Sequence, residues 1–189
     1  NVVLVGIGGS SLGVKALKSM LEGSKGIKRE LLFLDNVDPC SYKSTLGGVN
    51  FDETLFVISS KSGNTIETIT IFKCLLDDFK PQNLGKNFLI ITDPGTNLEN
   101  FAKENGIKVV LCTGRPIVSI VHLLEELDLM GDDDYAVNFN GGLIQKTKYG
   151  EIVYETGHTV EDMKYCHEEV TKVGLPLVMI DTVRAYEPT

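Results

Sequence analysis

Apolar runs and helical patterns alternate over the first 113 residues of the chain. Short, almost wholly apolar runs predict buried strands at residues 2–7, 31–35, 55–59, 87–92 and 107–113. Between them, apolar residues recur at helical spacing within residues 11–22, 65–79 and 98–105. This order is typical of α/β proteins, so we expect a doubly wound, parallel five-stranded sheet with strand order 2-1-3-4-5. In that order the loops after the first and third strands flank the switch point where ligands bind.

The regular alternation ends after residue 113. Helical spacing returns at residues 117–129 and 159–173. Residues 135–145 read as a strand running into a turn, residues 148–155 as a hairpin arm and residues 175–181 as a final strand. Because these elements do not alternate one by one, they predict a C-terminal α+β extension. We therefore expect an α/β domain over residues 1–113 and a helix with a partial α+β segment over residues 114–189.

The composition is that of an ordinary globular protein. Of the 189 residues, 42% are hydrophobic and 23% are charged, and the formal net charge is −8. The sequence contains no long run of Lys or Arg, which argues against binding to nucleic acid or to an anionic membrane. Any phosphate site must therefore use local donors and not a global positive field.

The four cysteines indicate the compartment. Cys40, Cys74, Cys112 and Cys166 are scattered and none forms a C-x-x-C pair, which is typical of reduced thiols. The first residues do not read as a signal peptide, and no apolar run approaches the ~20 residues that span a bilayer. We expect a cytoplasmic protein.

The first motif is GIGGSSLG, residues 6–13, between the first predicted strand and helix. Its glycines let the backbone turn tightly and approach a ligand, while Ser10 and Ser11 can cap the helix or donate to an anion. The motif is not a clean G-x-G-x-x-G, but Asp35 at the end of the second predicted strand keeps a dinucleotide site open. A tight turn with a serine cap is the third interpretation.

The second motif is SSKSGNTIET, residues 59–68, between the third strand and its helix. Hydroxyls of Ser60, Ser62 and Thr65 gather where helix N–H groups have no partner and the helix dipole favours an anion. Lys61 adds a cation, so the loop favours a phosphate monoester, although it is not a P-loop. The alternative is a polar loop with one cap, but one cap needs only one hydroxyl.

These motifs carry a resemblance to a known family. GIGGSSLG, FLDNVDP (33–39), VISSKSGNTIET (57–68) and FLIITDPGTNLENFAKENG (88–106) resemble the sugar isomerase (SIS) domain, most closely that of phosphoglucose isomerase. The resemblance implies that a sugar phosphate is held by residues of both loops, namely Gly9, Ser10, Ser60, Lys61, Ser62 and Thr65. It also places Glu67 near the substrate loop. That family takes its catalytic Glu and His from segments with no match here, so the catalytic residues are unknown and we expect no isomerisation by this chain.

A second resemblance begins near residue 105. IKVVLCTGRPIVSIVHLLEELDL (107–129), DDYAVNFNGGLIQ (133–145), GEIVYET (150–156) and VMIDTVRAY (178–186) resemble the Cof-type branch of haloacid dehalogenase-like phosphatases. The resemblance implies that the Thr113 hydroxyl and the Gly114 N–H contact a phosphate. The D-x-D-G-T nucleophile loop of that superfamily is not in the sequence, so a polar turn is the other interpretation of Thr113 and Arg115.

Together the resemblances indicate a composite chain whose change of family falls within AKENGIKVVL, residues 102–111. The first hypothesis is a sugar-phosphate-binding domain, and the alternatives are a phosphatase-like protein or a non-catalytic chimeric scaffold. We expect the ligand to be a sugar phosphate or inorganic phosphate or sulfate. The sequence shows no ligand spacing for a metal around His122, His158 or His167, so we expect no metal and no cofactor. Unpaired strand edges in residues 135–189 predict a homodimer or a strand-swapped oligomer.

Overall fold

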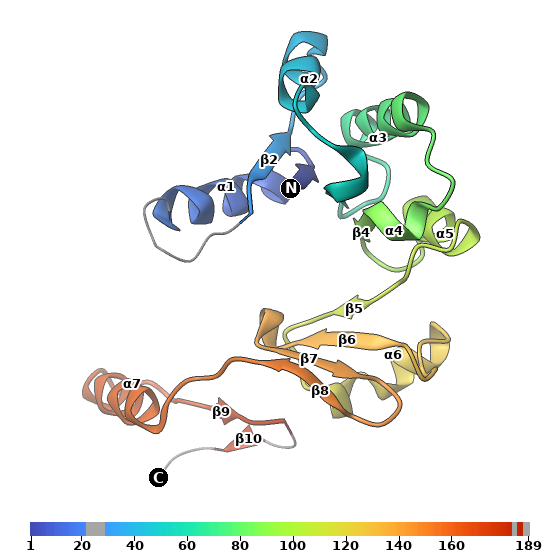
Figure 1. Ribbon diagram of the computed structural model, residues 1–189. Coiled ribbons are helices and arrows are strands. Elements are labelled where there is room, and N and C mark those ends of the chain that lie inside the picture. Colours follow the sequence, from blue (N-terminus) through green and yellow to red (C-terminus); the bar gives the residue numbers. More distant parts are fainter. Residues whose placement is uncertain (22–28, 183–184, 187–189) are drawn as a thin grey trace. The chain divides into compact units, whose positions relative to one another are not determined.

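The computed structural model describes residues 1–21, 29–182 and 185–186. The chain divides into two compact units, Asn1–Val109 and Val110–Thr189, each with its own sheet (Figure 1). None of the helices in the described ranges is long and apolar enough to cross a membrane.

The first unit is built on a parallel four-stranded sheet of order β2-β1-β3-β4. Its strands are β1 (Val2–Val5), β2 (Leu31–Leu34), β3 (Leu55–Ser59) and β4 (Phe88–Ile91). Its helices are α1 (Gly9–Leu21), α2 (Pro39–Leu46), α3 (Ile66–Phe79), α4 (Leu84–Asn87) and α5 (Asn97–Glu104). The predicted α/β class and the predicted order of the first four strands are thereby confirmed.

The core of this unit is aliphatic at β1 and aromatic around β3 and β4. Val3, Val5 and Ile58 are fully buried. The Phe56 ring stacks on Phe88 with a centroid distance of 5.3 Å, and further phenylalanines extend this cluster. The strands present alternate positions to this core: in β3, Phe56 and Ile58 are buried, whereas Leu55 is exposed and Val57 is half-buried.

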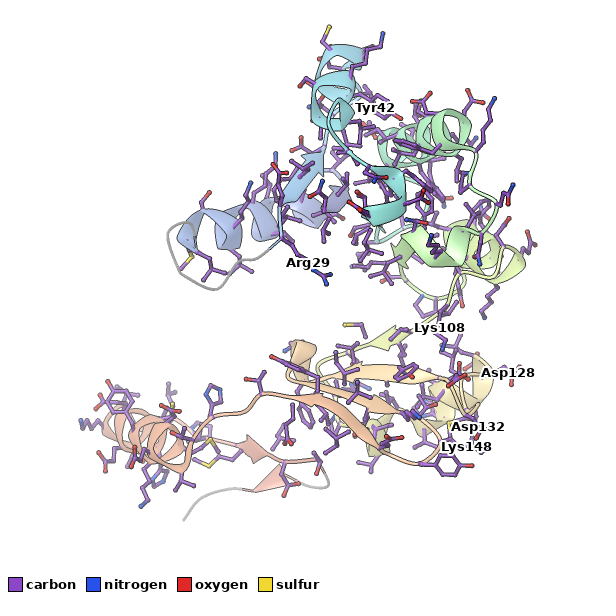
Figure 2. All side chains as sticks on the ribbon, viewed as in Figure 1. Arg29, Tyr42, Lys108, Asp128, Asp132 and Lys148 are labelled. Carbon is purple, nitrogen blue, oxygen red and sulfur yellow. The ribbon has the colours of Figure 1, made fainter. Side chains whose placement is uncertain are left out.

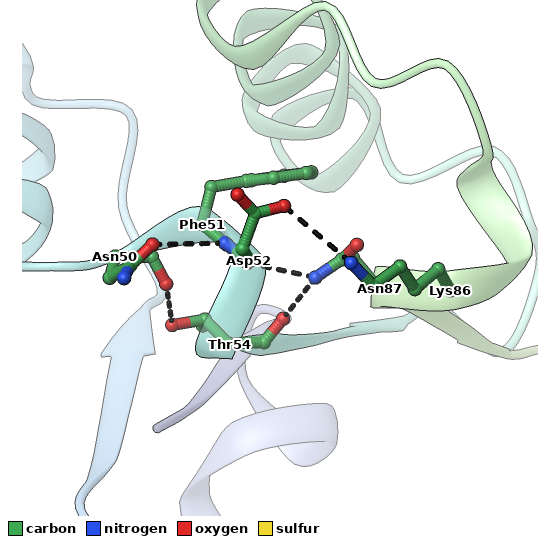
Figure 3. A network of polar contacts seen from close by, with 6 residues as sticks. All are labelled: Asn50, Phe51, Asp52, Thr54, Lys86 and Asn87. Carbon is green, nitrogen blue, oxygen red and sulfur yellow. Dashed lines mark hydrogen bonds and ion pairs between the residues drawn. The ribbon is translucent and has the colours of Figure 1, made fainter.

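A polar network ties the amino ends of β3 and β4 together (Figure 3). The Asn87 side chain is buried, and its Nδ2 donates to the carbonyl oxygens of Phe51 at 2.8 Å and Thr54 at 2.9 Å. Phe51 lies in the 3₁₀ turn η1 (Phe51–Glu53), where Asn50 Oδ1 accepts from the Asp52 N–H at 3.2 Å. Since these carbonyls precede β3 and Asn87 precedes β4, the network fixes where both strands begin.

The second unit is built on a mixed sheet of order β5-β6-β7-β8. Its strands are β5 (Leu111–Cys112), β6 (Tyr135–Asn138), β7 (Leu143–Lys146) and β8 (Ile152–Glu155), and only the β5–β6 pair is parallel. The 3₁₀ turn η2 (Ile117–Ser119) leads into α6 (Val121–Glu126). α7 (Val160–Lys172) precedes the antiparallel pair β9 (Met179–Ile180) and β10 (Ala185–Tyr186).

The prediction of a fifth strand in this parallel sheet is wrong. Within residues 107–113 only Leu111 and Cys112 form a strand, and they pair with Ala136 and Val137 of β6 in the second unit. Ile107 instead turns back onto the first unit, because its N–H donates to the Ala102 carbonyl at 2.9 Å and its side chain is buried. The run is therefore divided between two cores.

Two predicted elements of the second unit are also corrected. Residues 135–145 run from a strand into a turn as expected, but the run also contains a second strand: β6 is followed by the 3₁₀ turn η3 (Phe139–Gly141), where Phe139 and Asn140 adopt positive φ, and then by β7. The helix expected over 117–129 is divided into η2 and α6 at Ile120, which has φ −124° and ψ 6°, and it ends before Asp128, which has φ 55°.

Candidate functional site

The loop of residues 60–65 connects the carboxyl end of β3 to the amino end of α3. Because the sequence predicts a phosphate site here, we call it the phosphate loop. Thr65 is the N-cap residue of α3, but its side chain makes no capping hydrogen bond. Its Oγ1 instead accepts from Ser60 Oγ at 3.0 Å. The first N–H groups of this 14-residue helix therefore remain available at the positive end of the helix dipole.

The predicted phosphate-loop residues differ in exposure. Lys61 and Ser62 are exposed, Thr65 is half-buried, and Ser60 is 1% exposed. Ser62 Oγ accepts from the Asn64 N–H at 3.3 Å, which leaves the hydroxyl proton free to donate. Ser60 is therefore an internal brace for Thr65, whereas the other three side chains reach the surface.

Charge at this helix end depends on Lys61. None of the ion pairs found among the described residues includes its ammonium group. Glu67 lies in the first turn of α3, where its carboxylate opposes an anion. A bound phosphate would therefore need Lys61 as its local counter-charge.

The loop between β1 and α1 lies against the end of β3. A Cβ on Gly6 would approach Ser10 Cβ to 3.0 Å and the Ser59 carbonyl oxygen to 3.1 Å, so only glycine fits without a shift. Gly9 is exposed as the first residue of α1, and Ser10 is half-buried. The structure thus brings the Gly9–Ser10 segment and the phosphate loop to the same edge of the sheet.

A third segment, residues 92–97, comprises the loop after β4 and the first residue of α5; it reaches the phosphate loop and was missed in the sequence. Gly63 has φ +65°, and a Cβ there would lie 2.5 Å from Thr96 Cβ. Thr96 is the N-cap of α5 and accepts from the Glu99 N–H at 3.2 Å. The sequence did contain a sign of this contact: TDPGTN lies between a predicted strand and a predicted helix. Loops after neighbouring parallel strands lie at the same edge of the sheet, so this loop could have been expected near the phosphate loop.

Asp35, the residue that kept a dinucleotide site open, is already engaged. It follows β2 and forms an ion pair with Lys15 of α1. The Lys15 ammonium also lies 5.4 Å from the centroid of the Phe33 ring. A ribose diol needs a free carboxylate acceptor at this position, so the structure disfavours the dinucleotide interpretation.

Thr113 and Gly114, the second candidate phosphate contact, lie in the second unit after β5. The Thr113 N–H donates to the Val137 carbonyl at 2.9 Å, and its Oγ1 accepts from the Arg115 N–H at 3.2 Å. Buried Asn138 donates through Nδ2 to the Arg115 carbonyl at 2.8 Å. The Thr113 hydroxyl thus closes its own turn, as the polar-turn interpretation expects, and still has a proton to donate.

The remaining candidate groups do not gather into a metal site. Among the described residues, no group of three or more His, Cys, Asp or Glu side chains is placed to hold a metal ion. Asp132, the first of three consecutive aspartates at residues 132–134, pairs with Lys148 at 2.7 Å, and Figure 2 labels both residues. That hydrogen bond holds the pKa of the Asp132 carboxyl below its usual range.

Two protein families match different parts of the chain. The sequence profile of the phosphoglucose isomerase family matches residues 1–108, and that of haloacid dehalogenase-like hydrolases matches residues 94–188. The chain belongs to both families. The two matches overlap over residues 94–108, which include α5, so the chain is composite as the sequence predicts.

Individual relatives divide in the same way. Glucose-6-phosphate isomerase of Campylobacter jejuni is 47% identical over 110 residues, 57% of this chain and 27% of that protein. YxeH of Bacillus subtilis, named as a phosphatase, is 33% identical over 98 residues, 52% of this chain and 36% of that protein. A crystal structure of glucose-6-phosphate isomerase from Chlamydia trachomatis superposes with a TM-score of 0.51 at 29% identity, covering 55% of this chain and 20% of that one. The chain thus spans about a third or less of each relative.

Proposed function

We propose that the isomerase-like unit, a domain of the sugar isomerase type, binds the phosphate group of a sugar phosphate at the phosphate loop. The observation that carries this proposal is the amino end of α3, which has no side-chain cap and directly follows the loop that contains Lys61, Ser62 and Thr65. Backbone N–H groups at a helix start form an anion site when no side chain satisfies them. The relatives named as glucose-6-phosphate isomerases support the sugar-phosphate class.

Each residue has a distinct part in this proposal. Lys61 supplies the positive charge, which is needed because the chain carries a net charge of −8. Ser62 and Thr65 donate hydroxyl hydrogen bonds, and Ser60 fixes the Thr65 rotamer through its 3.0 Å hydrogen bond. Gly9 and Ser10 form the neighbouring wall, where the exposed backbone of Gly9 admits a close approach.

We propose binding and not turnover for this site. Aldose–ketose isomerisation needs a base that moves a proton between two carbons. The proposed ligands are hydroxyls, backbone N–H groups and one ammonium, which stabilise an anion but do not abstract a carbon-bound proton. Fructose 6-phosphate should therefore bind without conversion to glucose 6-phosphate.

Calorimetric titration with fructose 6-phosphate and 6-phosphogluconate tests the site. The double variant Ser62→Ala, Thr65→Ala should bind at least about tenfold more weakly, because each lost hydrogen bond to a charged group contributes about 1.5–3 kcal/mol. Ser44→Ala, an exposed serine on α2, is the matched control and should bind as the wild type does. Equal affinity in the wild type and the double variant, or no binding to either, would overturn the assignment.

A phosphatase-like activity of the second unit is the second candidate. The hydrolase-family match over residues 94–188 and the spare hydroxyl proton of Thr113 favour it. If the second unit is a phosphatase, the protein should hydrolyse p-nitrophenyl phosphate in the presence of Mg²⁺, and Thr113→Ala should reduce the rate at least about tenfold. Absence of hydrolysis, or hydrolysis unaffected by Thr113→Ala, would reject this role for Thr113.

A further inference from the structure

The loop of residues 92–97 holds the backbone of the one cation in the phosphate loop. The Lys61 carbonyl accepts from the Asp93 N–H at 3.0 Å and from Thr92 Oγ1 at 3.4 Å. One residue earlier, the Ser60 N–H donates to the Ile91 carbonyl at 3.0 Å. These contacts come from the end of β4 and the loop after it, so that segment fixes where the Lys61 side chain starts.

Steric contact at Gly63 complements these hydrogen bonds. Gly63 is buried with φ +65°, and a Cβ there would lie 2.5 Å from Thr96 Cβ and 2.8 Å from Thr96 Oγ1. Such distances are far inside van der Waals contact, so the turn closes only because residue 63 has no side chain. Beside it, Asn97 Nδ2 donates to Asn64 Oδ1 at 3.3 Å.

Thr96 is itself held in place from two sides. Its Oγ1 lies 3.0 Å from Thr92 Oγ1 and also caps α5 by accepting from the Glu99 N–H. Glu99 is 6% exposed, and its Oε2 accepts from the Gly95 N–H at 2.6 Å while its Oε1 pairs with Lys103 at 3.0 Å. A buried carboxylate with both oxygens engaged anchors the loop to α5, so Thr96 presents a rigid surface to Gly63.

We infer that residues 92–97 are the positioning loop of the anion site, and that phosphate affinity depends on the packing of Thr96 against Gly63. This inference rests on the proposed function. The only formal charge in the loop is the carboxylate of Asp93, which repels a phosphate. The loop therefore acts through Lys61 and Gly63 and not by contacting the phosphate, which makes Thr96 a positioning residue.

A size-swap experiment on the whole chain tests this packing. Gly63→Ala inserts a methyl group against Thr96, and Gly63→Ala with Thr96→Gly removes the atoms that it meets. Thr96→Gly alone removes the same contact from the other side without filling the space. Because glycine is an acceptable N-cap, this variant should weaken both ligands while α5 stays folded. Affinity for inorganic phosphate and fructose 6-phosphate is measured by calorimetry, the unfolding midpoint by circular dichroism, and backbone order by amide exchange of residues 61–65.

Gly63→Ala should weaken both ligands at least about tenfold, because displacing Lys61 and the turn loses hydrogen bonds to a charged group. Exchange of the 61–65 amides should accelerate while the rest of the first unit stays protected. The double variant should regain most of the affinity, short of full recovery because alanine is strained at positive φ. Unchanged affinity in Gly63→Ala, or a double variant no better than Gly63→Ala, overturns the positioning role.

The experiment distinguishes failure of the proposed phosphate binding from failure of the positioning role of residues 92–97. If the wild type binds neither ligand, the proposed function fails and the affinity claim with it. If the wild type binds and Gly63→Ala binds equally well, only the positioning loop is rejected. A fall in the unfolding midpoint of Gly63→Ala with affinity per folded molecule unchanged also rejects it, since the contact would then serve stability alone.

Discussion

The two units of this chain bury their elements to very different degrees. In the first unit every strand contributes to one core, and α3 buries Thr68, Ile71, Phe72 and Leu75. In the second unit all four residues of β8 are exposed, and none of the 13 residues of α7 is buried. Buried apolar area is the main favourable term in folding, so equal lengths of chain here do not carry equal stabilisation.

The difference shows that secondary structure alone does not report a packed domain. α7 has a complete capping box, in which Thr159 Oγ1 accepts from the Asp162 N–H at 3.1 Å and Asp162 Oδ2 accepts from the Thr159 N–H at 2.9 Å. Local capping therefore defines this helix without burial of its faces, whereas α3 lacks a side-chain cap and is held by the core.

Removal of one large side chain from each unit gives the largest expected contrast. Phe56→Ala deletes a fully buried ring and should destabilise the first unit by about 3–5 kcal/mol. Tyr165→Ala on α7 removes an exposed ring and should change stability by less than about 0.5 kcal/mol. Urea unfolding followed by circular dichroism measures both, and equal losses in the two variants would refute the contrast.

Two buried asparagines, one in each unit, sharpen the comparison. Asn87→Ala leaves the Phe51 and Thr54 carbonyls without their donor and should cost about 2–4 kcal/mol. Asn138→Ala loses a single bond to Arg115 and also removes a buried Oδ1 that has no partner among the described residues, so about 1 kcal/mol is expected.

Chemical denaturation of both asparagine variants gives the two values. Asn83→Ala serves as the control for Asn87, because Asn83 is exposed and its side chain makes no capping bond. A larger loss of unfolding free energy in Asn138→Ala than in Asn87→Ala would contradict this comparison. It would mean that the buried asparagine of the second unit contributes more through its hydrogen bonds.

Acid titration of the α7 cap gives the smallest effect. Hydrogen bonds from Thr159 hold the pKa of the Asp162 carboxyl below its ordinary value of 3.8. A carboxyl with a lowered folded-state pKa stabilises the helix above its unfolded pKa, and this stabilisation is lost as pH falls through the folded pKa. The amides of residues 159–162 should therefore show fraying below about pH 4 in NMR spectra. Asp162→Asn should abolish this pH dependence, and persistence of the transition in that variant would assign it to another group.

Four strands and their order were predictable because each strand is a short, continuous apolar run that contributes buried side chains to one core. LFVIS at residues 55–59 is an example, and it forms β3 with the predicted bounds. The run at 107–113 looks the same but is shared between two cores, with Ile107 on one and Leu111 on a strand of the other. The spacing of apolar residues indicates that a segment is buried but not which strand it pairs with. The fifth strand was therefore assigned to the wrong sheet.

The candidate site was predictable only in part, for a related reason. Hydroxyls, glycines and a lysine next to a helix start are visible in the sequence, and the structure places them at one sheet edge. The burial of Ser60 and the contact of Gly63 with Thr96 depend on residues about 30 positions apart, which no local pattern reports. The expected homodimer or strand-swapped oligomer stays a prediction.

The return of Ile107 onto the first unit has a consequence for protein engineering. Its buried side chain and the hydrogen bond from its N–H to the Ala102 carbonyl hold the chain on the first unit, and Val109, the last residue of that unit, also packs against the core. A different sequence joined after Val109 therefore does not have to contribute side chains to the core of the first unit. The helix–glycine–strand junction at residues 97–112 is therefore a natural exchange point, where a domain can be replaced as a cassette with its own first strand.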